Sequence, residues 1–179
     1  MKVEFVFAGF GGQGILLMGR VIAQAAMEEG RYVTFLPSYG PEMRGGTANA
    51  CVVVSDQPVA SPIIDHSDVL VAMNQPSYEK FGPLVRGGGL IIYDSSLVQA
   101  RERAQVRQVG GAFTEIAGQL GNTLVCSMVA IGRVIRETGI ARLETVRLQV
   151  QALTAKRPEL TALNLEAVER GYNEQEVQR

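Results

Sequence analysis

Short apolar runs and longer amphipathic segments alternate along this chain. Apolar runs of four to eight residues between turn residues are typical of buried strands, whereas apolar positions that recur every third or fourth residue are typical of helices. The predicted strands cover residues 5–10, 32–36, 47–54, 69–73, 90–93 and 105–109. The predicted helices cover residues 15–29, 76–81, 123–136, 141–153 and 160–172.

This alternation predicts an α/β fold, with an open, mostly parallel Rossmann-like sheet and helices on both of its faces. We expect the 179 residues to form one domain, 1–179, with a C-terminal helical extension at 141–179. The first two strands must run in the same direction, because a helix joins them. No helix separates residues 36 and 47, so the strand at 47–54 is either an added edge strand or an antiparallel strand.

The boundaries of several elements follow from glycines, prolines and the apolar pattern. We expect a short buried strand at 33–36, a turn at Gly87-Gly88-Gly89, and a connection at 113–117 that leads into the next loop. Leu124 is the first apolar position of the predicted helix at 123–136. The helix after the first strand ends before Gly30, which suits a C-cap. Its apolar face is formed by Ile15, Met18, Val21, Ile22 and Ala25.

The first strand runs into a glycine-rich loop with the spacing G-x-G-x-x-G. The loop residues of interest are Gly9, Gly11, Gly12, Gln13 and Gly14. Without a Cβ the backbone can turn sharply into the helix, and a ligand can approach its N–H groups closely. The unpaired N–H groups of the helix carry partial positive charge, so a phosphate is the expected ligand. Alternatively, the glycines serve only to pack strand against helix. A Walker-type loop is excluded, because Ile15 stands where a Lys is required.

A dinucleotide would require an acidic residue at the end of the second strand, to bind the ribose hydroxyls. That strand instead runs into Pro37 and Ser38. Glu28 and Glu29 have the right separation from the loop, but they lie at the end of the helix, where we expect solvated side chains. A stand-alone Rossmann-like protein that binds NAD and regulates other proteins is therefore the alternative, not the preferred interpretation.

The segment after the second strand is the second candidate site. Arg44 is its only cation and could bind a carboxylate or phosphate bidentately, with Gly45-Gly46 letting the chain fold over a ligand. Tyr39 and Met43 offer a flat or polarizable surface to an adenine or to a partner subunit. The alternative is an ordered surface loop in which Arg44 pairs with Glu42.

Three polar residues at strand ends, Asn74, Asp94 and Ser95, are further candidates, although helix capping explains them equally well. The two cysteines, Cys51 and Cys126, lie in separate apolar strings and lack the spacing of a zinc or iron-sulfur site, so we expect buried thiols. The single histidine, in a polar turn, is expected to be a loop residue. No catalytic residue and no metal site is predicted.

The formal net charge is −1 and the basic residues are scattered, which excludes a nucleic-acid interface of the usual basic kind. No apolar run is long enough to span a membrane, and the N-terminal segment lacks the pattern of a cleavable signal peptide, so we expect a cytoplasmic protein.

The glycine loop and the segment Ser38-Tyr39-Gly40-Pro41-Glu42-Met43-Arg44-Gly45-Gly46 together resemble the gamma subunit of the 2-oxoacid:ferredoxin (acceptor) oxidoreductases, which act on pyruvate, 2-oxoglutarate, 2-oxoisovalerate or indolepyruvate. The resemblance includes residues 68–74 and 121–132 and weakens after about Gly139. Ser127 stands before Met128 where the family often has Asn, which leaves the role of that helix open.

The resemblance implies a non-catalytic gamma subunit in a hetero-oligomer that oxidatively decarboxylates a 2-oxoacid, passes electrons to ferredoxin and forms an acyl-CoA. Thiamine diphosphate and the iron-sulfur clusters are then expected in partner subunits, and coenzyme A is the possible ligand of this chain. The residues implied to bind it are Gly9, Gly11, Gly12, Gln13, Gly14, Ser38, Tyr39, Gly40, Met43, Arg44 and Gly45.

Overall fold

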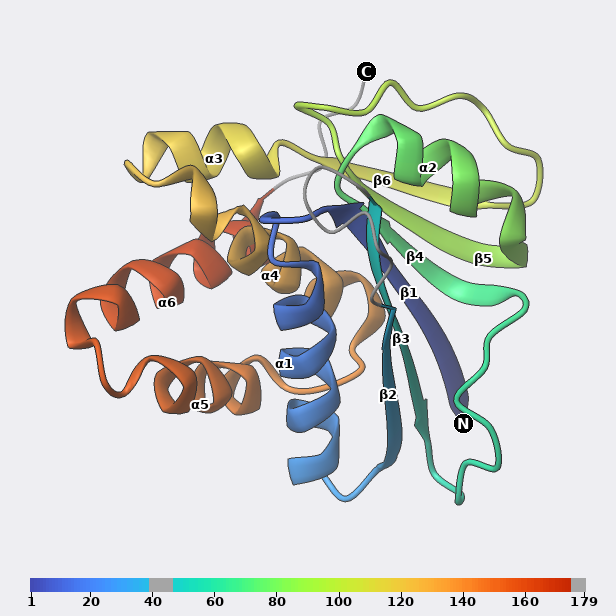
Figure 1. Ribbon diagram of the computed structural model, residues 1–179, viewed down its shortest axis with the longest axis horizontal. Coiled ribbons are helices and arrows are strands. Elements are labelled where there is room, and N and C mark those ends of the chain that lie inside the picture. Colours follow the sequence, from blue (N-terminus) through green and yellow to red (C-terminus); the bar gives the residue numbers. More distant parts are fainter. Residues whose placement is uncertain (39–46, 175–179) are drawn as a thin grey trace.

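A computed structural model describes residues 1–38 and 47–174 of the chain, which form a sheet flanked by helices (Figure 1). The strands are β1 (Lys2–Phe10), β2 (Tyr32–Ser38), β3 (Thr47–Ser55), β4 (Ser67–Ala72), β5 (Val85–Asp94) and β6 (Arg107–Gly111). The helices are α1 (Ile15–Glu28), α2 (Gln75–Phe81), α3 (Phe113–Gln119), α4 (Cys126–Thr138), α5 (Leu143–Thr154) and α6 (Pro158–Asn173). Short 3₁₀ turns at Gly82–Leu84 and Thr123–Val125 precede β5 and α4.

The described strands form one sheet in the order β2-β3-β1-β4-β5-β6. Strands β1, β4, β5 and β6 are parallel to their neighbours, whereas β3 is antiparallel to both β1 and β2. The predicted α/β fold with a mostly parallel sheet is therefore confirmed. The strand at 47–54 is antiparallel, as one alternative had it, but the edge position is wrong, because β3 lies between β1 and β2.

Helices cover both faces of the sheet, as predicted, but unequally (Figure 1). The larger core lies on the side of α1 and α4, where Phe5 and Phe7 of β1 are fully buried. The smaller core lies on the side of α2, where Tyr78 packs with Val6 and Leu70. Residues 5, 6 and 7 thus alternate between the two cores, as the two-residue period of a strand requires.

Four local predictions are wrong. The strand predicted to be buried at 33–36 is the edge strand β2, where Leu36 is 42% exposed because no described strand covers its outer side. Residues 87–89 lie within β5, where Gly88 has φ +83° beside a register shift, rather than in a turn. Residues 113–117 form most of α3. Leu124 lies in the 3₁₀ turn before α4 and is 70% exposed.

Helices α4 and α6 cross at two glycines. A Cβ at Gly132 would lie 2.6 Å from the backbone nitrogen of Tyr172, and a Cβ at Gly171 would lie 2.6 Å from the carbonyl carbon of Val129. The two backbones are therefore in direct contact, and only glycine permits this distance. Pro158 is the first residue of α6, where its missing N–H costs nothing.

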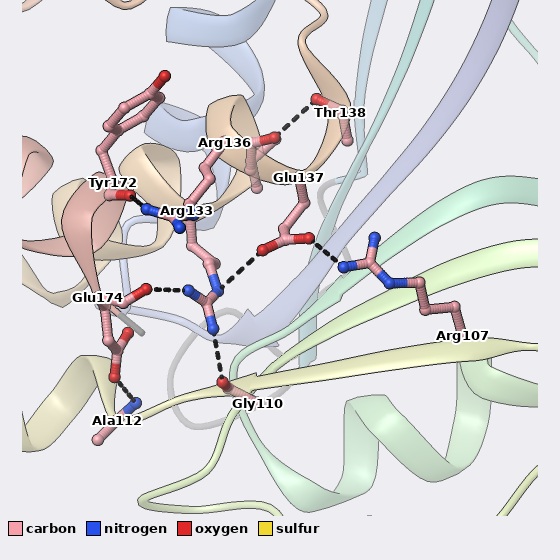
Figure 2. Close-up of polar contacts among 10 residues, drawn as sticks. Arg107, Gly110, Ala112, Arg133, Arg136, Glu137, Thr138, Tyr172 and Glu174 are labelled. Atoms are coloured by element: carbon pink, nitrogen blue, oxygen red, sulfur yellow. Dashed lines mark hydrogen bonds and ion pairs between the residues drawn. The ribbon is translucent and has the colours of Figure 1, made fainter. Parts of the chain in front are cut away.

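A buried arginine joins α4 to the end of α6 and to the sheet, as Figure 2 shows. The guanidinium of Arg133, whose side chain is 1% exposed, donates hydrogen bonds to the carbonyl oxygens of Glu174 and Gly110 and lies 3.5 Å from a carboxylate oxygen of Glu137. The carboxylate of Glu174 accepts a hydrogen bond of 3.0 Å from the N–H of Ala112, just before α3. A buried cation requires such partners, because its transfer from water is otherwise very costly.

Candidate functional site

The glycine loop forms a tight turn at the end of β1. The N–H of Gln13 donates to the carbonyl oxygen of Phe10 at 3.2 Å, which closes a turn of four residues. Gly12, the third of them, has φ +95°, the sign that a type II turn requires at this position. Among the described residues, no atom lies within 4 Å of the place a Cβ of Gly12 would take, so this glycine is needed for its conformation and for an open approach.

Helix α1 begins directly after the loop without a side-chain cap. Its N-cap residue, Gly14, has the left-handed φ of +74°, and no acidic residue lies in the first turn. A Cβ on Gly14 would lie 2.5 Å from the hydroxyl oxygen of Ser127, so the start of α4 also excludes a larger residue here. The N–H groups at this helix start are left without a capping side chain, which makes them suitable donors for an anion.

A pocket of about 310 Å³ lies beside the loop. It is lined by Phe10, Gly11, Gly12, Gly14, Ile15, Leu16, Leu17, Ser38, Thr47 and Ala48. Strands β1 and β2 run in the same direction through the antiparallel β3, so the end of β2 and the start of β3 reach the same sheet edge as the loop. The pocket combines apolar side chains with backbone donors, and its volume is at the lower end of the range for small-molecule sites.

The structure thus brings Ser38 together with Gly11, Gly12 and Gly14. Gly9 and Gln13 are placed differently: Gly9 is buried beneath the loop, and the side chain of Gln13 hydrogen-bonds to protein groups. The predicted site residues Tyr39, Gly40, Met43, Arg44 and Gly45 lie outside the described residues, as does the suggested pair of Arg44 with Glu42.

Five residues that line the pocket are not among the site residues predicted from the sequence, although all lie in or beside the predicted loops: Phe10, Leu16, Leu17, Thr47 and Ala48. The helical period of α1 placed its buried face correctly, but a sequence pattern does not show which of the remaining side chains border a cavity. Their position within two or three residues of the loop was the only available signal.

A larger hollow of about 650 Å³ lies along residues 95–100 at the end of β5. None of its lining side chains is charged, and neither the glycine loop nor the start of α1 lines it. The smaller pocket at the loop is therefore the better candidate for an anionic ligand.

The geometry does not suit a dinucleotide in the usual Rossmann manner. In that fold the acidic ribose-binding residue follows a strand adjacent to the first, whereas here β3 separates β2 from β1 and β2 ends at Ser38. Glu28 and Glu29 lie at the opposite end of α1, about 20 Å from the loop at 1.5 Å per residue. They are too far away to bind a ribose there.

The expectation that both glutamates are simply solvated is correct for Glu28 and wrong for Glu29. The Glu29 carboxylate accepts a hydrogen bond of 2.8 Å from the N–H of Arg142, which is the N-cap residue of α5. Burial raises the pKa of Glu29, but hydrogen bonds from Thr145 and Arg142 and the charge of Arg142 outweigh it and lower that pKa overall. The carboxylate therefore fixes α5 against the end of α1.

Among the polar residues at strand ends, Asn74 caps a helix, as the alternative interpretation held, whereas Asp94 is not an N-cap residue. Asn74 caps α2 by accepting a hydrogen bond of 2.9 Å from the N–H of Ser77. Asp94 is fully buried and accepts hydrogen bonds from the N–H and hydroxyl of Thr114 and from the N–H of Ser96. These carboxylate and amide oxygens are occupied by backbone and hydroxyl donors.

The cysteines and the histidine follow the expectation except for Cys51. Cys126 is buried and His66 lies in an exposed bend, as expected, whereas Cys51 is only half-buried; both cysteines are free thiols. Within residues 1–38 and 47–174, no group of three or more His, Cys, Asp or Glu side chains could hold a metal ion. None of the helices in this part of the chain combines the length and apolar character needed to cross a membrane.

Comparison with known proteins gives a match to the family model "Pyruvate ferredoxin/flavodoxin oxidoreductase" over residues 4–174. The chain is 38% identical to the 2-oxoglutarate synthase subunit KorC of Archaeoglobus fulgidus over 88% of this chain and 82% of that protein. It is 39% identical to the ketoisovalerate oxidoreductase subunit VorA of Methanothermobacter marburgensis over 95% of this chain. The chain spans only 36% of the length of that VorA protein.

Two solved structures have the same fold. The gamma subunit of a keto/oxoacid ferredoxin oxidoreductase from Geobacter sulfurreducens PCA superposes with a TM-score of 0.80 at 28% identity, covering 95% of this chain and 96% of that one. The 2-oxoglutarate:ferredoxin oxidoreductase from Magnetococcus marinus, solved with 2-oxoglutarate, coenzyme A and succinyl-CoA bound, gives a TM-score of 0.87 at 25% identity. The match covers 95% of this chain and 30% of the Magnetococcus chain.

Proposed function

The chain belongs to the pyruvate ferredoxin/flavodoxin oxidoreductase family, and from this premise we propose that it is the gamma-type component of a multi-subunit 2-oxoacid:ferredoxin oxidoreductase. In this proposal the assembled enzyme decarboxylates a 2-oxoacid, transfers two electrons to ferredoxin and joins the acyl group to coenzyme A. The isolated chain is inactive, and it works in the cytoplasm.

The proposed contribution of this chain is to help assemble the enzyme and to bind coenzyme A. The observation that carries the second role is the uncapped start of α1 beside the pocket of about 310 Å³. Its backbone N–H groups suit the phosphates of coenzyme A, and the apolar lining suits its adenine or pantetheine portion. The pocket is small, so it would take one part of the molecule, with the rest held by a partner subunit.

Partner subunits supply the thiamine diphosphate and iron-sulfur clusters in this proposal. Two kinds of relative support an assembly. The KorC protein is a separate subunit of similar length, whereas the VorA and Magnetococcus proteins contain a matching segment within a longer chain. A component that occurs either free or fused is expected to work beside the same neighbours in both arrangements. Which 2-oxoacid is the substrate depends on those neighbours.

The proposal is tested by comparing two glycine variants in the assembled enzyme. Gly12→Val introduces a side chain at φ +95° in the loop. The matched control, Gly30→Val, introduces one at φ +77° at the other end of α1. In both places no other described atom lies near the Cβ position. Both variants carry similar backbone strain. We expect Gly12→Val to raise the KM for coenzyme A at least tenfold while the control leaves it unchanged.

Arg44→Ala belongs to the same experiment as a prediction from the sequence. A hydrogen-bonded pair between a charged group and a desolvated anion contributes about 1.5 to 3 kcal/mol, which corresponds to a loss of roughly 10- to 150-fold. The coenzyme A role is wrong if neither Gly12→Val nor Arg44→Ala changes the KM or the assembly with partner subunits. Tight stoichiometric binding of NAD to the purified chain, measured by calorimetry, would instead favour the stand-alone regulator.

A further inference from the structure

The side chain of Gln13 closes the glycine loop from inside the protein. Its carboxamide oxygen accepts hydrogen bonds from the N–H of Phe10 at 2.7 Å and from the side-chain amide of Asn74 at 3.1 Å. Its amide nitrogen donates to the carbonyl oxygen of Met73 at 3.0 Å. The N–H of Phe10 determines which end of the carboxamide faces it, because only the oxygen can accept. Gln13 therefore links the end of β1 to the residues that follow β4.

Gly9 provides the space for this side chain. A Cβ at Gly9 would lie 2.5 Å from Cδ1 of Ile15 and 2.8 Å from the carboxamide oxygen of Gln13. The first glycine of the G-x-G-x-x-G pattern is thus needed to leave room for the side chains of Ile15 and Gln13, and it is buried beneath the loop.

Asn74 connects the loop to α2. Its side chain is 2% exposed, and its two ends have separate partners: the oxygen accepts from the N–H of Ser77, and the nitrogen donates to Gln13. One buried amide therefore fixes both the first turn of α2 and the position of Gln13. A buried polar group with all its partners present holds a single geometry, because breaking one bond leaves an unpaired group in the interior.

The outward N–H groups of the loop have no acceptor in the part of the chain that the structure describes. Both backbone polar groups of Phe10 are bonded to Gln13, whereas within the described residues no protein acceptor is found for the N–H groups of Gly11, Gly12 and Gly14. Gly11 and Gly12 are exposed at this end of the sheet.

We propose that Gln13 and Asn74 are positioning residues, which lock the glycine loop in the conformation that presents its backbone N–H groups to an anion. Gln13 acts on the loop directly, and Asn74 acts through Gln13. This inference rests on the proposed function for the identity of the ligand, coenzyme A. The effect of Gln13 and Asn74 on the loop conformation does not depend on which ligand binds. Holding the loop in advance spares the ligand the entropic cost of ordering it, which is about 1 to 2 kcal/mol for each backbone residue fixed.

Two variants distinguish an effect on the conformation of the glycine loop from a general loss of protein stability. Gln13→Ala removes all three hydrogen bonds of the side chain. Asn74→Asp keeps an acceptor for the N–H of Ser77, and hence the cap of α2, but it can no longer donate to Gln13. Gln75→Ala is the control, because this neighbouring amide bonds to the N–H of Gln99 and to Glu79 but not to the loop.

In the assembled enzyme we expect Gln13→Ala to raise the KM for coenzyme A about tenfold and Asn74→Asp about threefold, while kcat at saturating coenzyme A is unchanged. The double variant should match Gln13→Ala alone, because Asn74 has no effect once Gln13 is absent. In the full-length chain without ligand, amide hydrogen exchange at position 13, whose N–H bonds to the carbonyl oxygen of Phe10, should accelerate in both single variants and not in Gln75→Ala.

The exchange measurement decides the inference independently of the ligand. Unchanged exchange at position 13 in Gln13→Ala, or effects of the two variants on KM that simply multiply, would overturn the inference. If the exchange accelerates as expected but Gly12→Val leaves the KM for coenzyme A unaltered, the lock stands and the proposed ligand is wrong.

Discussion

The contact between α4 and α6 makes a sharp prediction, because it depends on the absence of two carbon atoms. In Gly171→Ala the new Cβ would lie 2.6 Å from the carbonyl carbon of Val129 and closer still to its oxygen. These are backbone atoms, so no side-chain rotation can relieve the overlap. The helices must separate by roughly 1 Å, and the closely packed groups around the crossing lose part of their dispersion energy.

The magnitude follows from two opposing effects. Overpacking a well-packed site costs about 1 to 3 kcal/mol, and an overlap with backbone belongs at or above the upper end. Alanine also gains up to about 1 kcal/mol over glycine in helix propensity. We therefore expect Gly171→Ala to lower the free energy of unfolding by about 2 kcal/mol or more, which for a protein of this size corresponds to a fall in Tm of roughly 4 to 8 °C.

Gly118→Ala is the matched control. Gly118 lies in α3, is exposed, and has no described atom within 4 Å of its Cβ position, so only the propensity gain remains and the variant should be slightly more stable. Urea unfolding followed by circular dichroism measures both changes. Gly132→Ala, at the same crossing, should resemble Gly171→Ala, and the double variant should cost less than the sum, since separated helices can accept both methyl groups. Equal effects of Gly118→Ala and Gly171→Ala would refute this account of the crossing.

Two further predictions concern titratable groups. Burial raises the pKa of Glu174, more than the hydrogen bond from Ala112 and the charge of Arg133 lower it, so the folded protein holds this proton to a higher pH than the unfolded chain (Figure 2). The resulting stabilisation is present below about pH 4.5 and is lost as the pH rises through the folded pKa. Glu174→Gln should therefore gain stability relative to the natural chain between pH 4 and 7. If urea unfolding finds the same difference in the free energy of unfolding throughout this range, the prediction is contradicted. Burial, followed by the negative charge of Asp94, raises the pKa of Cys126 to about 11, and burial also raises the pKa of Cys51. Both thiols should therefore resist iodoacetamide at pH 8 until urea is added, as judged by mass spectrometry, and rapid labelling of the native protein would argue against this burial.

Much of the loop and of the first helix could be predicted from the sequence, because their causes are local. Gly12 and Gly14 have positive φ angles that few other residues adopt, so their spacing after an apolar run indicates the turn without knowledge of the fold. The apolar period of α1 depends only on 3.6 residues per turn, and every residue predicted for its buried face is buried. The cap at Asn74 follows from the same local rules, whereas the bond from the N–H of Thr114 to Asp94 spans twenty residues and depends on the tertiary structure.

The sheet order was beyond the sequence, because strand pairing joins residues far apart in the chain. The apolar pattern of residues 47–54 would be similar at an edge or inside a sheet, and only the pairing of β3 with both β1 and β2 distinguishes them. The exposure of β2 follows from its place at the edge. Likewise, the glycines at 87–89 have the composition of a turn, and it is the pairing of β5 with β4 and β6 that keeps them within a strand.

The role of Gln13 shows the same division. The sequence by itself determined that a glycine turn precedes α1, since backbone sterics act between neighbouring residues. The sequence could not determine whether the side-chain amide of Gln13, between Gly12 and Gly14, faces a ligand or the protein. The tertiary structure decides this, because β4 lies beside β1 and brings Met73 and Asn74, some sixty residues away in the chain, within hydrogen-bonding distance of the Gln13 side chain.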